Sequence, residues 1–498
     1  MKIVKMSDYY PSVLFHNLIL ENINKFENRI ALVDGEKIVY FNEIPKLAES
    51  LENTIDLEKG DVILVCLPNS IWFPLLFLAA AKLGVVMSGI SSESTETEIQ
   101  YFIQESGAKM LYTDQKTSDR LSDVGIPIYV LQEFDNNFSV NPSKNESGNN
   151  SEIITIDDVL LAPFSSGTTG SPKCCFLTHR NFLASTYSLK QAVFDDLLKE
   201  SNKKTLAFLP FYHASGFWAL LLCLLEGCTI YIMNEFHPMK MMDMIEKYEI
   251  DTINIVPVIA NVFLKIGFIG GRCRSLRTIL CGSSGLSKER CRRLLSMFPQ
   301  VTNFLQGYGM TEIVVLSNLT PLNDNFEHLG SCGKLLPGFE AKLSGFDGEL
   351  FLRSDAIMKT YKNGSPNIDA DGWMKSGDIV EISDNGFFNI VDRKKDMIKV
   401  NGFQVSPTEI ENVILSLSKV VEVAVVGIED ELSGQLPKAF IVLEEGSEEL
   451  LFIKQLEHVL REKLSAIKQL RGGISFLKNL PKSASGKVQK NRLLEQLL

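Results

Sequence analysis

The sequence predicts an α/β protein with a large N-terminal domain of parallel sheets and a β-rich subdomain, followed by a small α+β C-terminal domain. Three observations predict this arrangement. Short apolar runs alternate with helical patterns through the first two thirds of the chain, as in parallel sheets covered by helices. After about residue 339 the pattern becomes that of antiparallel strands. A charged run at residues 392–396 then precedes a final stretch of about 100 residues, the size of a small domain.

The alternating part contains a series of short apolar runs that end in turn signals or lead into helices. We expect helices at residues 75–83 and 96–106. Thr95 and Glu98 have the spacing of a capping box at the start of the second helix. The loop at residues 136–151 is rich in Asn, Ser, Gly and Pro. The expected strands are 62–67, 85–90, 110–113, 128–131, 159–164, 205–209, 229–233, 252–256 and 278–281.

The last third predicts a β-rich subdomain and then the small domain. Strands expected at 348–353, 379–382 and 387–391 surround glycine turns. Beyond the charged run, Ser406, Pro407 and Glu409 are spaced as an N-cap, a first-turn proline and a capping-box glutamate. We expect strands at 420–426 and 439–443 and a helix at 450–467. The domain boundary is placed in the charged run.

Composition and charge limit the possible functions. The chain has 498 residues, a net charge of −11 and a pI of about 5.3, which argues against nucleic acid as a partner. The 9 cysteines are scattered without metal-site or simple disulfide spacing, as expected of reduced thiols in a cytoplasmic protein. The N-terminus has no apolar signal core. The apolar stretch at 71–90 contains a lysine and two glycines, so we interpret it as a buried helix and strand rather than a membrane segment.

The most informative stretch is a loop rich in hydroxyl groups and glycine between an expected strand and a helix that begins near His179. Small residues let backbone N–H groups approach an anion, and the hydroxyls and one lysine add donors for phosphate oxygens. A flexible surface loop has the same composition. The Walker spacing is absent, which disfavours a P-loop kinase or GTPase. The candidate ATP-binding residues in this loop are Ser165, Ser166, Gly167, Thr168, Thr169, Gly170 and Lys173.

This stretch closely resembles the signature of the adenylate-forming superfamily, which includes acyl-CoA synthetases, 4-coumarate–CoA ligases, firefly luciferase and peptide-synthetase adenylation domains. Cys174 departs from the family, which has glycine after the lysine. Residues 306–312 resemble the family's adenine- and metal-binding turn, which adds Gly307 and Gly309 to the ATP site. By this resemblance Tyr308 stacks on adenine, Thr311 binds the α-phosphate and Glu312 holds Mg²⁺, a cation that prefers oxygen ligands.

Further motifs follow in the family's order. Residues 373–378 resemble its Gly-Asp element, in which Asp378 binds the ribose hydroxyls, and Arg393 would be a second ribose contact. Residues 210–213 resemble the acyl-pocket motif, which places His213 beside the carboxylate, although a lone histidine is more often structural. The apolar run at 313–316 suits an aliphatic or aromatic acid, or is simply helix core. The acyl-pocket candidates are His213, Gly282, Ser283 and Val315.

The C-terminal motifs predict a mobile domain. Residues 481–487 resemble the family loop that ends in the adenylation lysine, here Lys487, whose charge would offset the repulsion between carboxylate and phosphate. Residues 392–402 resemble the hinge, with Lys395 as the pivot. By this resemblance residues 1–392 form the adenylation domain, 393–396 the hinge and 397–498 the mobile domain, which rotates between two half-reactions. Its CoA-side candidates are Lys399, Gly402 and Gln404.

The resemblance implies an ATP-dependent acid–CoA ligase that uses Mg²⁺ and coenzyme A and acts on a fatty or aromatic acid. An amino acid is disfavoured because residues 213–218 offer no carboxylate for an α-amino group. Two alternatives remain: a luciferase-like oxygenase, and a catalytically silent nucleotide-binding homologue. Retention of the site lysines, Thr311, Glu312, Asp378 and Arg393 speaks against the silent homologue.

Overall fold

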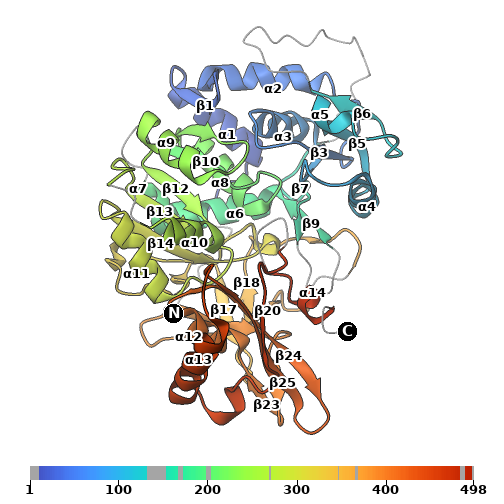
Figure 1. Cartoon of the computed structure of the whole chain (residues 1–498). Helices are drawn as coiled ribbons and strands as arrows, with labels where there is room; N and C mark the ends of the chain where they lie inside the picture. The colour runs from blue at the N-terminus through green and yellow to red at the C-terminus, as the bar shows by residue number, and fades with distance from the viewer. Residues whose placement is uncertain are drawn as a thin grey trace.

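The computed structural model describes residues 10–131, 153–165, 172–197, 203–267, 271–345, 347–364, 368–482 and 488–495. Its largest sheet has nine strands in the order β16-β15-β14-β13-β12-β10-β11-β1-β2 (Figure 1). The central strands β14, β13, β12, β10, β11 and β1 are parallel, and antiparallel strands close both ends. The strands are β1 (Ile30–Asp34), β2 (Lys37–Tyr40), β10 (Lys204–Ala207), β11 (Thr229–Ile232), β12 (Thr252–Ile255), β13 (Thr278–Cys281), β14 (Asn303–Tyr308), β15 (Asn318–Leu319) and β16 (Lys334–Leu335).

A second sheet of eight strands has the order β19-β9-β7-β4-β3-β5-β6, with β8 paired to β9. Its strands β7, β4, β3, β5 and β6 are parallel. Because β3 and β4 are buried along their whole length, their sequences do not alternate between apolar and polar residues, and the one hydroxyl in β4, that of Ser88, donates to the Ala162 carbonyl. The strands are β3 (Val62–Cys66), β4 (Val86–Ile90), β5 (Ala108–Thr113), β6 (Ile128–Val130), β7 (Val159–Leu161), β8 (Phe164–Ser165), β9 (Lys173–Thr178) and β19 (Thr360–Tyr361).

Helices cover the faces of these two sheets. The stretch at 71–90 is buried as helix α3 and strand β4, as expected, and Gly84 ends the helix in the left-handed conformation. No helix in the described ranges has both the length and the apolarity needed to cross a membrane. The helices are α1 (Phe15–Ile23), α2 (Ile44–Glu52), α3 (Trp72–Leu83), α4 (Glu96–Ser106), α5 (Gln115–Ser118), α6 (His179–Leu189), α7 (Asp195–Leu197), α8 (Ala214–Leu225), α9 (Pro238–Tyr248), α10 (Pro257–Ile266), α11 (Lys288–Met297), α12 (Pro407–Leu415), α13 (Glu449–Lys463) and α14 (Lys490–Glu495).

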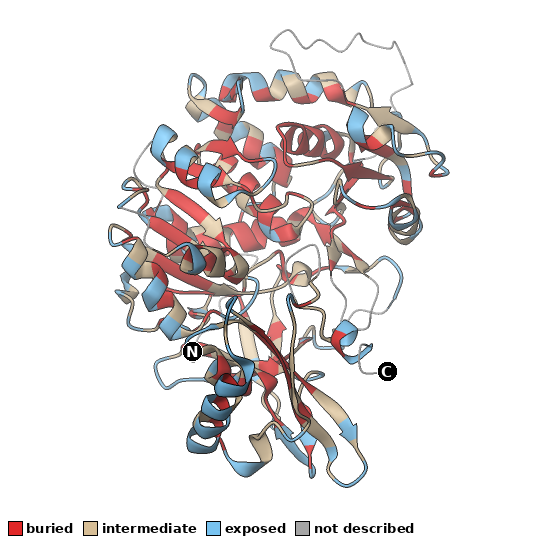
Figure 2. Ribbon diagram, in the orientation of Figure 1, coloured by how far each residue is buried: buried red, intermediate tan, exposed pale blue. Residues whose placement is uncertain are grey.

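The last third forms two smaller sheets, as predicted. One is an antiparallel sheet in the order β17-β18-β20-β21, and the other joins β23-β22-β25-β24 with β26 beside β25. Helix α13 packs on the second of these sheets with Phe452, Leu456 and Leu460 buried, and most of its other residues are exposed (Figure 2). The strands are β17 (Glu340–Leu343), β18 (Glu349–Arg353), β20 (Met374–Ile382), β21 (Phe388–Arg393), β22 (Ile398–Val400), β23 (Phe403–Val405), β24 (Val420–Asp430), β25 (Gly434–Leu443) and β26 (Ile474–Phe476).

The predicted fold class is confirmed, and three local expectations need correction or comment. The strand expected at 159–164 is two strands, β7 and β8, interrupted before Pro163, which has no N–H to donate. The capping box at the start of α12 is only half formed, because Ser406 caps the helix while the Glu409 carboxylate pairs with Lys468. Helix α13 ends at Lys463 rather than residue 467. The loop expected at 136–151 lies outside the described residues.

Candidate functional site

A cavity of about 1110 Å³ opens at the C-terminal ends of the strands of the nine-stranded sheet. This is where open α/β sheets bind ligands, because loops and helix N-termini converge there. The cavity reaches from the turn after β14 along the space between the sheet and helix α8. It brings together residues that the sequence singled out from three separate segments: His213, Gly282, Ser283, Gly307, Gly309, Thr311 and Val315.

The turn after β14 is built around Gly309. A Cβ atom on Gly309 would stand 1.5 Å from the backbone oxygen of Val315, so only glycine fits. The run at 313–316 is a 3₁₀ turn followed by Val314 and Val315 with φ of 50° and 85°, not a helix. β-branched residues are strained in this left-handed region, and such strain is typical of functional sites. Val315 and Leu316 line the cavity, whereas Val314 is buried in the core.

One side of this turn carries a buried polar cluster. The Tyr308 hydroxyl donates to the Asp378 carboxylate at 2.5 Å, and Arg393 Nε lies 3.1 Å from the same carboxylate. Burial and the neighbouring carboxylate raise the pKa of Tyr308 well above its ordinary value, so the phenol stays protonated. Asp378 is only 2% exposed, on β20, and Arg393 ends β21 in direct register with it. The structure thus joins all three predicted adenosine contacts.

The other side of the turn carries Glu312. Its Oε1 accepts a hydrogen bond from the Tyr361 hydroxyl at 2.8 Å, and Lys173 Nζ lies 5.4 Å from the centre of the same tyrosine ring. Burial, with the Glu312 charge, raises the pKa of Tyr361, which keeps it a donor. Two of the predicted phosphate-site residues, Lys173 and Glu312, therefore meet through a tyrosine on β19.

The donor set at Glu312 fits Mg²⁺ better than a metal held entirely by protein. Among the described residues no group of three or more His, Cys, Asp or Glu side chains could hold a metal. Mg²⁺ is ordinarily bound by one or two carboxylates together with water and substrate phosphates. Glu312, on the side of the turn where the phosphates are predicted to lie, supplies one such carboxylate.

His213 lies at the N-terminus of α8 and lines the cavity, with its ring 4.6 Å from that of Tyr212. The helix approaches the sheet closely at Gly216, where a Cβ atom would meet the backbone oxygen of Pro210 at 2.3 Å and that of Leu209 at 2.9 Å. Gly216 therefore fixes the first turn of α8, and with it His213, against the C-terminal end of β10.

Several predicted residues are not part of the cavity. Lys399, Gly402 and Gln404 lie on the exposed hairpin of β22 and β23, and Lys395 is exposed between the sheets. Asn401 and Gly402 both have positive φ, as a two-residue hairpin turn requires. The loop residues Ser166, Gly167, Thr168, Thr169 and Gly170, and the lysine at the C-terminal loop, Lys487, lie outside the described residues, whereas Ser165 is buried at the end of β8.

Three cavity or site residues carried no signal that sequence reasoning could use. Tyr361 lies on a two-residue strand about fifty positions after its partner Glu312. Trp218 and Asn254 line the cavity from α8 and β12, where a tryptophan and an asparagine in apolar surroundings gave no reason to suspect a site.

Comparisons with known proteins show which family the chain belongs to. Residues 20–362 match the AMP-binding enzyme family, and residues 409–487 match the AMP-binding enzyme C-terminal domain. The chain belongs to the AMP-binding enzyme family. The resemblance to adenylate-forming enzymes is thereby confirmed, and the protein is an AMP-forming ligase.

The relatives of this family member are named as CoA ligases. The chain is 31% identical to 4-coumarate-CoA ligase 1 of Narcissus pseudonarcissus, covering 99% of this chain and 96% of the relative. It is 29% identical to peroxisomal OPC-8:0-CoA ligase 1 of Arabidopsis thaliana, over 94% and 90% of the two chains. Among solved structures, o-succinylbenzoate coenzyme A synthetase of Bacillus subtilis with ATP and magnesium matches with a TM-score of 0.81, 25% identity, and coverage of 96% and 99%. An anthranilate CoA ligase in complex with anthranoyl-AMP shares the fold, with a TM-score of 0.86, 21% identity and 99% coverage of both chains.

Proposed function

We propose that this AMP-binding enzyme joins a carboxylic acid of fatty or aromatic character to coenzyme A through an acyl-adenylate. The observation that carries this proposal is the cavity, because one space joins the nucleotide turn to a long apolar recess. Its wall at Gly307, Gly309 and Thr311 suits a nucleotide phosphate. Its inner walls are mainly apolar, as a site for the body of an acid requires.

In the first half-reaction a carboxylate oxygen attacks the α-phosphorus of ATP. A new O–P bond forms, the bond to the bridging oxygen breaks, and pyrophosphate leaves with the electron pair. We assign binding of the α-phosphate to Thr311 and stabilisation of the developing charge to Lys487. Glu312 would hold Mg²⁺, which neutralises phosphate charge when bound. His213 would lie beside the carboxylate, and Tyr308, Asp378 and Arg393 would hold the adenosine.

In the second half-reaction the sulfur of coenzyme A attacks the acyl carbon. The C–S bond forms, the C–O bond to AMP breaks, and the thiol proton passes to solvent. Lys399, Gly402 and Gln404 are exposed on one hairpin, so they would reach the cavity only if the unit carrying them turned. Rotation of residues 397–498 about Lys395 would exchange Lys487 for this hairpin.

Replacement of Lys487 by alanine tests the assignment of the two half-reactions. Pyrophosphate exchange into ATP should slow by ~10²–10³-fold, because one electrostatic stabiliser of the transition state is lost. Thioester formation from supplied acyl-adenylate should change much less. Lys478→Ala, an exposed lysine nearby in the sequence, is the matched control and should leave both reactions unaltered. Equal losses in both half-reactions of Lys487→Ala would contradict the proposal.

The substrate and the two alternatives are tested with a panel of acids. Aliphatic and aromatic acids are supplied with ATP, and pyrophosphate release is measured against a sample without acid. Release that depends on acid, followed by acyl-CoA formation, supports the proposal. Release no greater than without acid would favour a silent nucleotide-binding homologue, and light emission with luciferin and oxygen would favour an oxygenase.

We include a cytoplasmic location in the proposal. All nine cysteines are free thiols, seven of them buried. Burial raises the pKa of the Cys174, Cys175 and Cys281 thiols, which keeps them protonated. Free thiols on this scale are typical of a reducing compartment.

A further inference from the structure

One wall of the cavity ends in a π turn, a conformation that is rare in proteins and frequent at functional sites. Residues Lys190–Phe194 form this turn between α6 and α7, and Phe194 lines the cavity. The Asp195 N–H donates to the Lys190 carbonyl, one residue further along the chain than the corresponding bond of an α-helix. The extra residue turns every later side chain about the helix axis, so it determines where Phe194 points.

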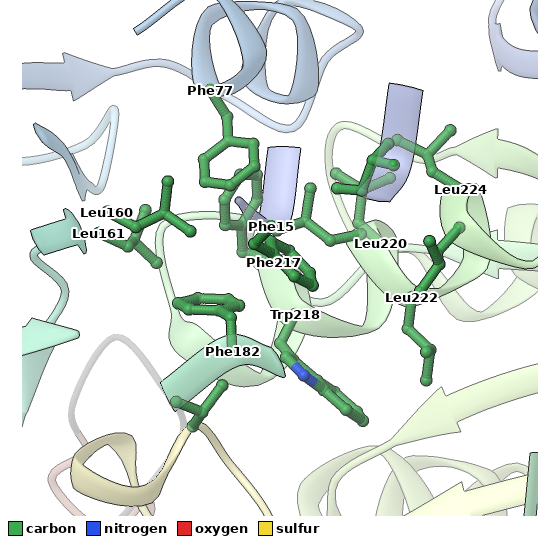
Figure 3. Close-up of a cluster of buried hydrophobic side chains, with 14 of the residues drawn as sticks. Phe15, Phe77, Leu160, Leu161, Phe182, Phe217, Trp218, Leu220, Leu222 and Leu224 are labelled. Carbon is green, nitrogen blue, oxygen red and sulfur yellow. The ribbon is translucent and has the colours of Figure 1, made fainter. Parts of the chain in front are cut away.

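Phe194 lines the cavity together with Trp218 of α8. The two ring centres lie 6.5 Å apart, the ring planes are inclined by 57°, and both side chains are buried. In Figure 3 the Trp218 ring extends away from the cluster formed by Phe77, Phe182 and Phe217. The π turn and α8 thus each supply one aromatic side chain to the same part of the cavity wall.

An ion-pair cluster holds the π turn against α8. The Lys190 ammonium contacts the carboxylate of Glu226, the residue that caps the C-terminus of α8, and lies 3.1 Å from the Asp195 carboxylate. Side chains that meet on an α-helix are three or four residues apart, so a contact between residues five apart fits the wider π turn. Lys190 therefore closes the turn and joins it to the end of α8, while Phe194 contacts Trp218 in the first half of the same helix.

The pair of Lys190 and Glu226 is largely shielded from water. Their side chains are 23% and 17% exposed, whereas that of Asp195 is 57% exposed. Burial alone would lower the pKa of Lys190, but the two carboxylates outweigh it and raise the pKa, so the ammonium stays charged. Removal of one partner from a shielded pair leaves the other charge uncompensated. We therefore expect loss of either charge to release the π turn from α8.

From these contacts we infer that Lys190 is a positioning residue for the acid site. It holds the π turn against α8 and so fixes Phe194 beside Trp218, and this aromatic pair limits the width of the acid that the cavity admits. Neither Lys190 nor Glu226 is among the described residues that line the cavity, so both act through Phe194. The inference rests on the proposed function, since it concerns the acid that the same cavity would activate.

The experiment measures acid-dependent pyrophosphate exchange by the full chain with acids of similar length and different width. One pair is 4-phenylbutanoic acid and 4-(1-naphthyl)butanoic acid, and the other is octanoic acid and 4-cyclohexylbutanoic acid. Should the chain prefer a different acid, that acid and its phenyl-substituted analogue form the pair. The quantity compared is kcat/KM for the wide acid divided by kcat/KM for the narrow acid. The KM for ATP is measured alongside.

Three variants release the wall and one retains it. Phe194→Ala should raise the ratio of wide to narrow acid by about 10-fold, because the wide acid gains room and the narrow acid loses contacts. Lys190→Met and Glu226→Gln should each raise it by about threefold, since Phe194 is then no longer held in place. Lys190→Arg keeps the charge and should leave the ratio within about twofold. The KM for ATP should stay within about twofold in all four variants.

A double variant separates positioning of Phe194 from general structural support. In the Phe194→Ala background, Lys190→Met should change the ratio by less than about twofold, because the ring through which Lys190 acts is gone. Two controls disrupt matched features away from the cavity: Lys82→Met breaks an ion pair between α2 and α3, and Phe476→Ala removes a paired ring in the last unit. Both should keep the ratio, and thermal unfolding midpoints verify that all variants are folded.

The outcomes separate this inference from the proposed function. Robust exchange with an unchanged ratio in Phe194→Ala, or in both Lys190→Met and Glu226→Gln, would overturn the inference and leave the ligase activity standing. Independent, additive effects in the double variant would also overturn it, as would an equal change of the ratio in Lys82→Met. No exchange with any acid by the unaltered chain would instead contradict the proposed function.

Discussion

The turn after β14, with the polar cluster of Tyr308, Asp378 and Arg393 beside it, and the hairpin at residues 398–405 differ in how firmly the fold holds them. Asp378 is 2% exposed and is contacted by Tyr308 and Arg393 from separate strands. Gly309 is enclosed by the backbone of its own turn. In the hairpin, by contrast, Phe403 is 63% exposed, and Lys399 and Gln404 point into solvent. The groups assigned to ATP are held inside the large N-terminal part of the chain, residues 10–393, which we call the frame. The groups assigned to the thiol step lie on an exposed hairpin.

This difference has a physical reason. Electrostatic stabilisation of a transition state requires donors that are already in place, since reorganisation at the moment of reaction costs free energy. Groups that act in a second step must be absent from the first, so they are best carried on an element that can move. We therefore expect substitutions in the frame to slow adenylation, and substitutions in the hairpin to slow thioester formation.

The largest effect should come from Gly309→Ala. The added methyl group would meet the Val315 backbone oxygen, which is no flexible side chain, so the whole turn must shift. A displacement of about 1 Å at a reacting site costs about 100-fold in rate, and we expect at least this loss in pyrophosphate exchange. Gly345→Ala, where a Cβ atom meets nothing within 4 Å, is the matched control. Near-normal exchange by Gly309→Ala would show that the turn is not rigid.

Low pH should lower the free energy of unfolding through His16 and His179. Their rings pack 5.4 Å apart between α1 and α6. The Phe15 N–H donates to His179 Nδ1, so that nitrogen must carry a lone pair. Burial lowers the pKa of His16 to about 4 and that of His179 to about 3. The unfolded chain takes up protons below about pH 6.5 while the folded chain does not, so stability is complete above that pH and is lost on acidification.

We expect each of these histidines to lower the free energy of unfolding by about 2 kcal/mol between pH 8 and pH 5, about 30-fold in the folding equilibrium. Urea titrations at the two pH values measure the change. His179→Gln should reduce the pH dependence, whereas His458→Gln, on the α13 helix of the last unit, should not. Stability that is flat across this interval, or that rises with acid, would contradict the assignment.

The hairpin is expected to give a selective effect. Lys399→Ala should slow thioester formation from acyl-adenylate by about 10-fold, as loss of one charged contact does, and should leave pyrophosphate exchange within about twofold. Lys419→Ala, a lysine at the turn before β24, serves as the control. A loss in exchange as large as the loss in thioester formation would erase the distinction between the two regions.

The smallest effect should come from Tyr361→Phe, which removes only the hydroxyl that donates to Glu312. We expect about a threefold rise in the Mg²⁺ concentration needed for half-maximal exchange, since the carboxylate loses one orienting hydrogen bond. The magnesium dependence of exchange measures it. Tyr40→Phe, an exposed tyrosine on β2, is the control. An unchanged magnesium dependence would show that the Tyr361 hydroxyl does not help Glu312 to bind Mg²⁺.

The sequence was informative wherever a local pattern decides the structure. The helix from Glu96 to Ser106 and its capping box are confirmed to the residue, because Thr95 and Glu98 contact each other within one turn. The motifs at 306–312 and 373–378 contain Tyr308 and Asp378, which the fold joins by a hydrogen bond. Contacts between distant segments could not be predicted, because nothing in the sequence near Tyr361 indicates its hydrogen bond to Glu312. The strain at Val314 was also invisible, because its apolar run has the composition of a helix core.

The join between β21 and the last unit has one further consequence. Asp392, on strand β21, accepts hydrogen bonds at Oδ2 from the Ser406 hydroxyl at 2.7 Å and from the Thr408 N–H at 2.9 Å. A carboxylate at this position offsets the partial positive charge of the α12 N-terminus. The first amides of α12 are thus sheltered only while strand and helix remain together. The rate at which these amides exchange with deuterated water would therefore report how often α12 separates from β21.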